Sequence, residues 1–410
     1  MSTAFSTLRR ALIAAGLVTA SAGLHAQSPQ TIVFWYHFDN PEQTKVMDTL
    51  VAEFQAKNPT IKIDAQNIPW NNYYDRLFTA VAGGKAPDVA MVKLQQQAQL
   101  VEMGALEPID SMVASWPGRN DLGDNLLSIN KGHDGKQYYL PLQYVVIYLY
   151  YRTDLFQKAG LQPPATCEQF VDAAKKLTLA ASANGGTPQY GFGMRGGRGG
   201  QDNWGPFVLS QAAMTPAELG SPKAVAANQM YVDLMRKDKS VPPSAPNDGF
   251  NEIINGFKSG QTAMIFHHIG SSKTMHDTLG EKVSAVPVPA CGGKRWTSFG
   301  DESNALFKQS KAKDAAWKWM TYLSGEGNVK FVGATGQMTV TKSGVSQVSF
   351  QPRFAKATAD SLPFAATLPP VPQTSDFVSN VWPTNMQRAL NGEVTSAQMM
   401  EAIAKHYATK

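Results

Sequence analysis

Cysteine is scarce in this chain: Cys167 and Cys291 are the only two among 410 residues. A fold held together by several disulfides is therefore excluded. An exported protein could join these two cysteines, but the sequence does not show that their Cα atoms come close enough for a bond. We expect two free, buried thiols, and a single disulfide is the alternative.

The chain also lacks a strong charge. Its 37 Lys and Arg residues against 32 Asp and Glu residues leave a net charge of +5. Residues 1–26 hold two arginines and no acid, so their removal would lower the net charge to +3. No block of basic residues stands out. The sequence therefore predicts no nucleic-acid partner and no binding to an anionic membrane surface.

Long apolar runs are missing, except near the N-terminus. Arg9 and Arg10 precede a run of small and apolar residues, 11–24, which closes on the small residue Ala26. A charged start, a short apolar stretch and a small-residue cleavage site are typical of a secretory signal peptide. The run is too short for a membrane anchor, because spanning a bilayer takes about 20 apolar residues. We predict that residues 1–26 are a signal peptide and that the protein is exported.

The motifs of common catalytic sites are missing too. The chain has no G-x-S-x-G, H-E-x-x-H or P-loop sequence. Gly191 to Gly196 matches G-x-G-x-x-G, but more glycines follow where a dinucleotide-binding fold needs a helix. The tandem pair His267 and His268 lacks the spacing of metal ligands on a strand. We expect no enzyme activity, no cofactor and no metal. A glycosidase, whose two acids can be distant in sequence, is the alternative.

What the chain does contain is an alternation of strand and helix patterns. Short apolar or alternating segments predict strands at 32–36, 61–65, 89–92, 144–151, 261–266 and 283–288. Helical spacing predicts helices between Pro41 and Asn58, at 74–82, after Thr166, and at 315–323, 382–391 and 395–407. The Gly-rich stretch 184–205 predicts a flexible loop. The order predicts an α/β fold with a mostly parallel sheet, in two lobes, with a ligand cleft beyond the strand ends.

Aromatic residues gather where the predicted strands end. They are Trp35, Tyr36, Phe38, Trp70, Tyr73, Tyr74, Tyr144, Trp204 and Trp382. Sugar rings pack their C–H faces on aromatic rings, and nearby amides and acids supply partners for their hydroxyls. The set favours a carbohydrate or polyol ligand. Core packing is the alternative for each ring taken singly.

Six segments, in order, resemble one known family. They are 32–63, with Asn58-Pro59; Gly84 to Val89, with PDV; Gly104 to Ile109; 134–156, ending in Tyr-Tyr-Arg-Thr-Asp-Leu-Phe; Phe257 to Met264; and 308–323. Together they resemble the extracellular solute-binding proteins of ABC importers, in the maltose-binding and glycerol-phosphate-binding branch. The resemblance covers nearly the whole mature chain.

The resemblance implies a periplasmic-binding-protein (Venus-flytrap) fold. It implies a first lobe of about 28–138 plus 292–342, a second lobe of about 139–291 plus 343–410, and a first hinge crossing near Gln137 to Pro141. It also implies a periplasmic monomer that closes on its ligand and delivers it to the permease subunits of an ABC importer.

From the family we take over only the places in the chain that contact ligand, not the identity of the residues there. The expected ligand-binding residues are Trp35, His37, Phe38, Asp39, Trp70, Gln95, Gln96, Tyr144, Arg195, Trp204, His268, Gly270, Asp301, Glu302 and Trp382. One departure is that Ser271 follows Gly270 where the family often has a tryptophan. We expect Trp204 to replace that stacking contact.

The expected ligand is a sugar or polyol. Arg195 and Arg198 could instead clamp a phosphate, since arginine pairs with planar anions through two hydrogen bonds, so glycerol 3-phosphate or a similar phosphorylated polyol is the alternative. Solvent-exposed loop arginines are the other interpretation. The sequence does not separate import from a receptor-signalling role with the same fold.

Overall fold

The computed structural model describes residues 29–38 and 41–409. The predicted signal peptide 1–26 and Asp39 lie outside the described residues, and the side chain of Asp301 is not described either. In the described part of the chain, no helix has both the length and the apolar character needed to cross a bilayer.

Nine strands of the described residues form one sheet. They are β1 (Gln30–Tyr36), β2 (Ile61–Asn67), β3 (Val89–Lys93), β4 (Tyr139–Arg152), β5 (Tyr190–Phe192), β6 (Thr262–His268), β7 (Val283–Val286), β8 (Thr297–Leu306) and β9 (Ala365–Ala366). The order is β2-β1-β3-β8-β4-β6-β5, with β7 on β4 and β9 on β8. Only the β1–β2, β1–β3, β5–β6 and β8–β9 pairs are parallel, so the expected mostly parallel sheet is a mixed one. The reason is that β8 enters antiparallel between β3 and β4.

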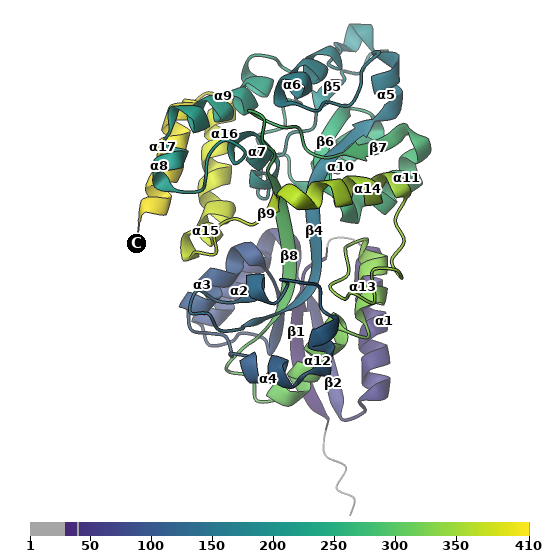
Figure 1. Cartoon of the computed structure of the whole chain (residues 1–410), viewed down its shortest axis with the longest axis vertical. Coiled ribbons are helices and arrows are strands. Elements are labelled where there is room, and N and C mark those ends of the chain that lie inside the picture. The colour runs from purple at the N-terminus through teal and green to yellow at the C-terminus, as the bar shows by residue number, and fades with distance from the viewer. Residues whose placement is uncertain (1–28, 39–40, 410) are drawn as a thin grey trace, which may run out of the picture.

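Helices cover this sheet in two groups (Figure 1). The first group holds α1 (Pro41–Lys57), α2 (Trp70–Ala82), α3 (Leu94–Glu102), α4 (Asp110–Ser115), α12 (Lys313–Ser324) and α13 (Asn328–Thr335). The second holds α5 (Thr153–Lys158), α6 (Cys167–Lys176), α7 (Gln201–Val208), α8 (Pro216–Leu219), α9 (Pro222–Arg236), α10 (Phe250–Ser259), α11 (Ser272–Leu279), α14 (Pro352–Ser361), α16 (Trp382–Asn391) and α17 (Ser396–Ala408). Between the groups, α15 (Pro372–Asp376) lies against α3.

The hydrophobic cores follow the same division. Two clusters are built from β1–β3, their helices, α12 and α13, and we call this body the first lobe. Two others are built from β5–β7, the second group of helices and the C-terminal segment, and we call this body the second lobe. Leu140 and Leu142 of β4 pack in the first lobe, whereas Ile147 and Leu149 of the same strand pack in the second. The predicted residue boundaries of the lobes stay a prediction, because β4 and β8 run through both.

Local sequence signals explain several helix ends. Thr166 caps α6, and its hydroxyl accepts the Gln169 backbone N–H while the Gln169 side chain reaches back, as the capping-box pattern predicts. Gly392, with φ of +82°, ends α16, because glycine adopts this left-handed backbone without strain. The two predicted C-terminal helices are thereby confirmed as α16 and α17.

Two expectations for the second lobe are wrong. Cys167 and Cys291 form a disulfide, with Cα atoms 5.1 Å apart. The backbone brings them together, because the Cys167 N–H donates to the Ala290 carbonyl at 3.1 Å. The stretch 184–205 is also not one flexible loop, since β5 and the start of α7 fall within it. Most of its glycines from Gly191 onward pack tightly: a Cβ on Gly196 would lie 2.4 Å from the Ala245 carbonyl oxygen.

Candidate functional site

A cavity of about 440 Å³ lies between the lobes. Strands of each lobe end at this cavity, and β4 and β8 pass from one lobe to the other beside it. The first lobe contributes the loop after β1, the start of α2 and the β3–α3 junction. The second contributes the loop before α7, α7 itself, α10 and the end of β6. The cavity therefore occupies the position beyond the strand ends that an α/β fold reserves for ligands.

Ten of the fifteen expected ligand-binding residues line this cavity. They are His37, Phe38, Trp70, Gln95, Gln96, Tyr144, Arg195, His268, Gly270 and Glu302. They come from both lobes and from the crossing strands. Their role in binding stays a prediction, and the geometry shows what each could offer.

Three expected residues, all tryptophans, lie in the hydrophobic cores instead. Trp204 and Trp382 are fully buried with ring centroids 6.3 Å apart, and the Trp204 indole N–H donates to Asn228 at 2.8 Å. Trp35 packs in a core cluster of the first lobe, and the Arg76 guanidinium lies 4.9 Å from its ring. This corrects the expectation for all three. Trp204 belongs to α7, which turns its ring into the core, so it does not replace the tryptophan missing after Gly270.

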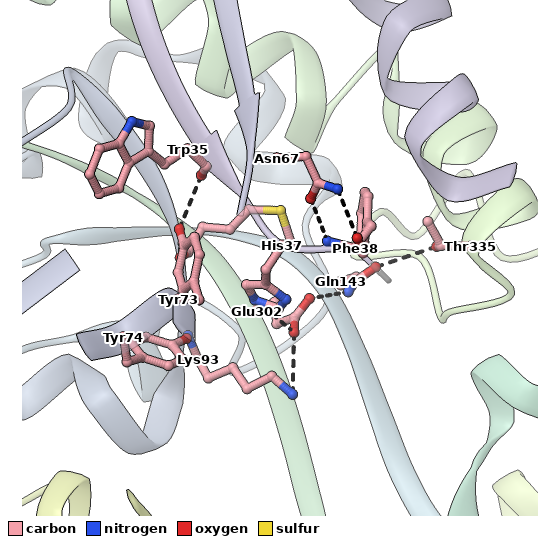
Figure 2. A network of polar contacts seen from close by, with 11 residues as sticks. Trp35, His37, Phe38, Asn67, Tyr73, Tyr74, Lys93, Gln143, Glu302 and Thr335 are labelled. Carbon is pink, nitrogen blue, oxygen red and sulfur yellow. Dashed lines mark hydrogen bonds and ion pairs between the residues drawn. The ribbon is translucent and has the colours of Figure 1, made fainter. Parts of the chain in front are cut away.

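Glu302 is the centre of a polar network at the cavity floor (Figure 2). Its carboxylate lies 3.5 Å from His37 Nε2 and 3.4 Å from Lys93 Nζ. The Gln143 amide donates to its other oxygen and also accepts from Thr335 at 3.4 Å. The register of β8 between β3 and β4 makes these contacts, because Glu302 pairs with Lys93 on one side and with Gln143 on the other.

The network keeps Glu302 charged. Burial raises the pKa of a carboxyl group, but the neighbouring His37 and Lys93 and the Gln143 hydrogen bond outweigh that effect. The pKa of Glu302 therefore lies below its ordinary value. The carboxylate is therefore fixed in place, and its oxygens can accept hydrogen bonds while the positive charge of Lys93 balances its negative charge.

Aromatic rings form the wall of the first lobe around this floor. The His37 ring centroid lies 4.9 Å from that of Trp70 and 4.7 Å from that of Tyr73. Lys93 Nζ lies 4.3 Å from the Trp70 ring centroid, a cation–π contact. The Lys93 backbone N–H donates to the Tyr74 hydroxyl at 2.8 Å.

The side chain of Asn67 helps to hold the loop after β1 in place. Asn67 accepts the Phe38 N–H and donates to the Phe38 carbonyl, both at 2.8 Å (Figure 2). Asn67 ends β2, the parallel neighbour of β1. The two adjacent strand ends therefore fix the position of Phe38 at the cavity.

Among its groups at the cavity, the second lobe adds the buried Arg195, the acid Asp202 and two histidines. Burial lowers the pKa of Arg195 to about 10, and the charges of Asp202 and Glu252 oppose that shift. Burial raises the pKa of Asp202, and its hydrogen bond with Ser298 and the positive charge of Lys93 oppose that shift. Arg195 thus stays a cation at neutral pH, beside an acid that is harder to ionise than usual.

His267 and His268 are neutral at ordinary pH. Burial lowers the pKa of His268 to about 3, with a further lowering from the charge of Lys93. Burial also places the pKa of His267 well below its ordinary value. His268 Nδ1 accepts the Gly270 N–H at 3.1 Å, which leaves its other ring nitrogen to carry the proton.

Several buried polar atoms at the cavity have no hydrogen-bond partner among the described residues. They are the side-chain oxygens of Gln96, Gln201 and Gln337, the Asn203 amide nitrogen and Arg195 Nε. Buried polar groups are normally paired, so a cluster of such atoms around one cavity indicates groups kept for a ligand or for water.

Sequence reasoning missed many residues of this site, among them the polar residues Lys93, Gln143, Asp202 and Asn203. Lys93 directly follows the predicted strand 89–92, so the rule applied to His37 would have found it. Asp202 and Asn203 follow the glycines at the start of α7, a signal visible only once that helix is known. Gln143 lies in the middle of β4 and carries no local signal.

The comparisons with known proteins agree with this arrangement. Residues 40–330 match the family model described as bacterial extracellular solute-binding protein. The chain belongs to this family. The mannitol-binding protein of Pseudomonas aeruginosa is 27% identical over 366 residues, which cover 80% of this chain and 79% of that protein. The sn-glycerol-3-phosphate-binding periplasmic protein of Escherichia coli is 30% identical, but over only 165 residues, or 37% of this chain.

Solved structures confirm the Venus-flytrap fold of this solute-binding protein. A solute-binding protein of Thermotoga lettingae, bound with α-D-tagatose, superposes with a TM-score of 0.83 at 23% identity and covers 92% of this chain and 98% of its own. One of Agrobacterium vitis, with bound D-mannitol, gives a TM-score of 0.74 at 23% identity and covers 92% and 97%. The predicted α/β two-lobed architecture is thereby confirmed.

Proposed function

We propose that this solute-binding protein captures a sugar or polyol in the cavity between its lobes and delivers it, after hinge closure, to the permease subunits of an ABC importer from the periplasm. The observation that carries the proposal is the cluster of unpartnered buried amides and one guanidinium around a cavity with an aromatic wall. Each hydroxyl of a sugar or polyol both donates and accepts, and the cluster holds donors and acceptors side by side.

The charges of the cavity favour a neutral ligand. Lys93 is paired with Glu302, and Arg198 with Asp75. Arg195 lies close enough to Asp202 for that charge to influence its pKa. A phosphate would have to compete with these acids for each cation, whereas a hydroxyl can bond to the charged pairs as they stand.

Glycerol 3-phosphate or a related phosphorylated polyol remains the second candidate. It is favoured by one observation: Lys93 and Arg195 reach the cavity from opposite lobes. Two cations that converge on closure could grip a phosphate between them. The ligand screen below separates the two candidates.

We also propose that the protein binds without catalysis. A glycosidase pairs a protonated general acid with a second, ionised carboxylate that acts as nucleophile or base. Asp202, with its raised pKa, could hold a proton, but the ionised Glu302 is engaged by His37, Lys93 and Gln143 rather than left free for the second role. Incubation of the purified protein with oligosaccharides should release no new reducing ends. Release that Glu302→Gln abolishes would replace this proposal with a hydrolase.

The deciding experiment is a thermal-shift screen followed by calorimetric titration. The compounds are mannitol, ribitol, tagatose, maltose, maltotriose and sn-glycerol 3-phosphate. A ligand that binds only the folded state raises Tm by mass action, so we expect a neutral member of this set to raise it and the phosphate not to. If only the phosphate raises Tm, the second candidate replaces the first. If no compound does so at millimolar concentration, the sugar and polyol proposal fails.

A further inference from the structure

Arg198 joins the two lobes at the rim of the cavity. Its Nε donates to the Ser379 carbonyl at 3.0 Å, within the second lobe. Its Nη1 donates to the Asn71 carbonyl at 3.1 Å and to the Asp75 carboxylate at 3.2 Å, both on α2 of the first lobe. One guanidinium is therefore anchored in one lobe and bonded to the other.

The helix that Arg198 holds also carries part of the cavity wall. Asn71 and Asp75 are four residues apart, so they lie on one face of α2, toward Arg198. Trp70 and Tyr74, also four apart, lie on the neighbouring face and line the cavity. A bond to the first face thus restrains the helix that presents the second.

The glycines that follow Arg198 fix the backbone position of this residue. Gly199 has a φ of +85°, and a Cβ there would lie 2.2 Å from Arg195 Nη2. A Cβ on Gly200 would lie 1.9 Å from the Arg195 carbonyl oxygen. The backbone therefore wraps tightly around Arg195, which leaves that residue at the cavity and Arg198 at its rim.

We propose that Arg198 is a positioning residue that latches the lobes, so that it sets ligand affinity and residence time through closure rather than through recognition of the ligand. The inference rests on the proposed function for its ligand. The bonds to Asn71 and Asp75 exist only while the lobes are together, so they stabilise the closed form alone. A ligand that needs the closed form binds with an apparent affinity scaled by the population of that form.

The latch has a signature that ligand recognition lacks. Arg198 reaches the cavity, but Asp75 does not line it, and the Asp75 side chain is 62% exposed. The ion pair should therefore be screened by salt even when the ligand is neutral. Closure should also respond to Asp75, a residue with no access to the ligand.

The test compares Arg198→Gln, Asp75→Asn and the double variant, with Lys330→Gln as the control. Lys330 pairs with Glu53 on the surface of the first lobe only. Using the compound found by the screen, we expect Asp75→Asn to raise Kd about two- to fivefold and Arg198→Gln about tenfold, mostly through faster dissociation. The double variant should match Arg198→Gln, because both changes break one contact. The control should bind like the wild type.

Salt supplies a second arm. The Kd of the wild type should rise between about 50 mM and about 500 mM NaCl, and that of Asp75→Asn should not. An unchanged Kd for Asp75→Asn, or effects of the two single changes that add in the double variant, would assign Arg198 to direct ligand contact and overturn the latch.

A third arm needs no ligand. Spin labels on the exposed residues 62 and 176, one in each lobe, report the interlobe distance of the free protein. Arg198→Gln and Asp75→Asn should both shift the distances toward the open form, while Lys330→Gln should not. Identical distances in wild type and latch variants refute the latch even if no compound in the screen binds, so this failure is distinct from failure of the proposed function.

Discussion

Acid should destabilise this protein through His268 as the pH falls below about 6.5. Burial and the nearby Lys93 lower the pKa of His268 from 6.5 to about 3. The unfolded chain then binds a proton that the folded chain excludes, so this contribution to stability is present above pH 6.5 and is lost as the pH falls from 6.5 toward 3. By linkage, the loss between about pH 7.5 and about pH 5 is about 2 kcal/mol.

The substitution that tests this is His268→Asn. An asparagine side-chain oxygen can accept the Gly270 N–H as His268 Nδ1 does, but it does not titrate. The lowered pKa of His267 also makes the free energy of unfolding fall as the pH falls, whereas the raised pKa of Asp202 makes it rise. Both residues remain in the variant. The difference between wild type and variant therefore reports His268 together with its charge coupling to His267.

Urea unfolding of the ligand-free proteins, followed by tryptophan fluorescence at about pH 7.5 and about pH 5, gives the four free energies by linear extrapolation. We expect the wild type to lose about 2 kcal/mol more than His268→Asn between the two values. The variant's absolute stability is not the readout, because the lost ring contacts lower it at both pH values. An equal loss in both proteins would refute the lowered pKa, and hence the neutral state, assigned to His268.

Three further predictions concern the tryptophans and the disulfide. Trp70→Ala should raise the Kd of the ligand about tenfold with little change in Tm, by calorimetric titration, because the ring lines the cavity. Trp204→Ala should instead lower the free energy of unfolding by about 3–5 kcal/mol in urea titrations, because the ring is fully buried. An unchanged free energy of unfolding would contradict the core position of Trp204. Replacing Cys167 and Cys291 by serine should cost about 2–5 kcal/mol in the same assay without changing Kd, since the disulfide closes a loop of 124 residues within the second lobe.

Local patterns predicted most elements of the fold. A local pattern marks each of three elements: an apolar run marks β1, helical spacing marks α1, and alternation marks β2. Each of these elements can therefore be predicted without the rest of the chain. What these patterns could not show was β8. It pairs with β3 and β4, which lie more than 150 residues earlier, and no local period encodes such a register. The mixed sheet was therefore missed along with it.

The same limit explains the errors in the site. The rule that ligands lie beyond strand ends found His37, Trp70 and Gln95 because each follows a strand that was predicted. Trp204 and Trp382 also stand among glycines or polar residues, and only the packing of α7 against α16 turns both rings inward. A buried tryptophan and a cavity tryptophan thus have the same local sequence signature.

The paired charges and the unpartnered amides of the cavity both favour the binding of a neutral, polar ligand. Folding has already removed Gln96, Asn203 and Gln337 from water without giving every polar atom a protein partner. The cost of desolvating those atoms is then carried by the folded state rather than by the binding step, so each hydrogen bond to a hydroxyl contributes more fully to affinity. The Glu302–Lys93 pair adds strong, fixed hydrogen-bonding groups while cancelling its own field. We therefore expect a cavity built in this way to select its ligand by the number and direction of hydroxyls rather than by net charge.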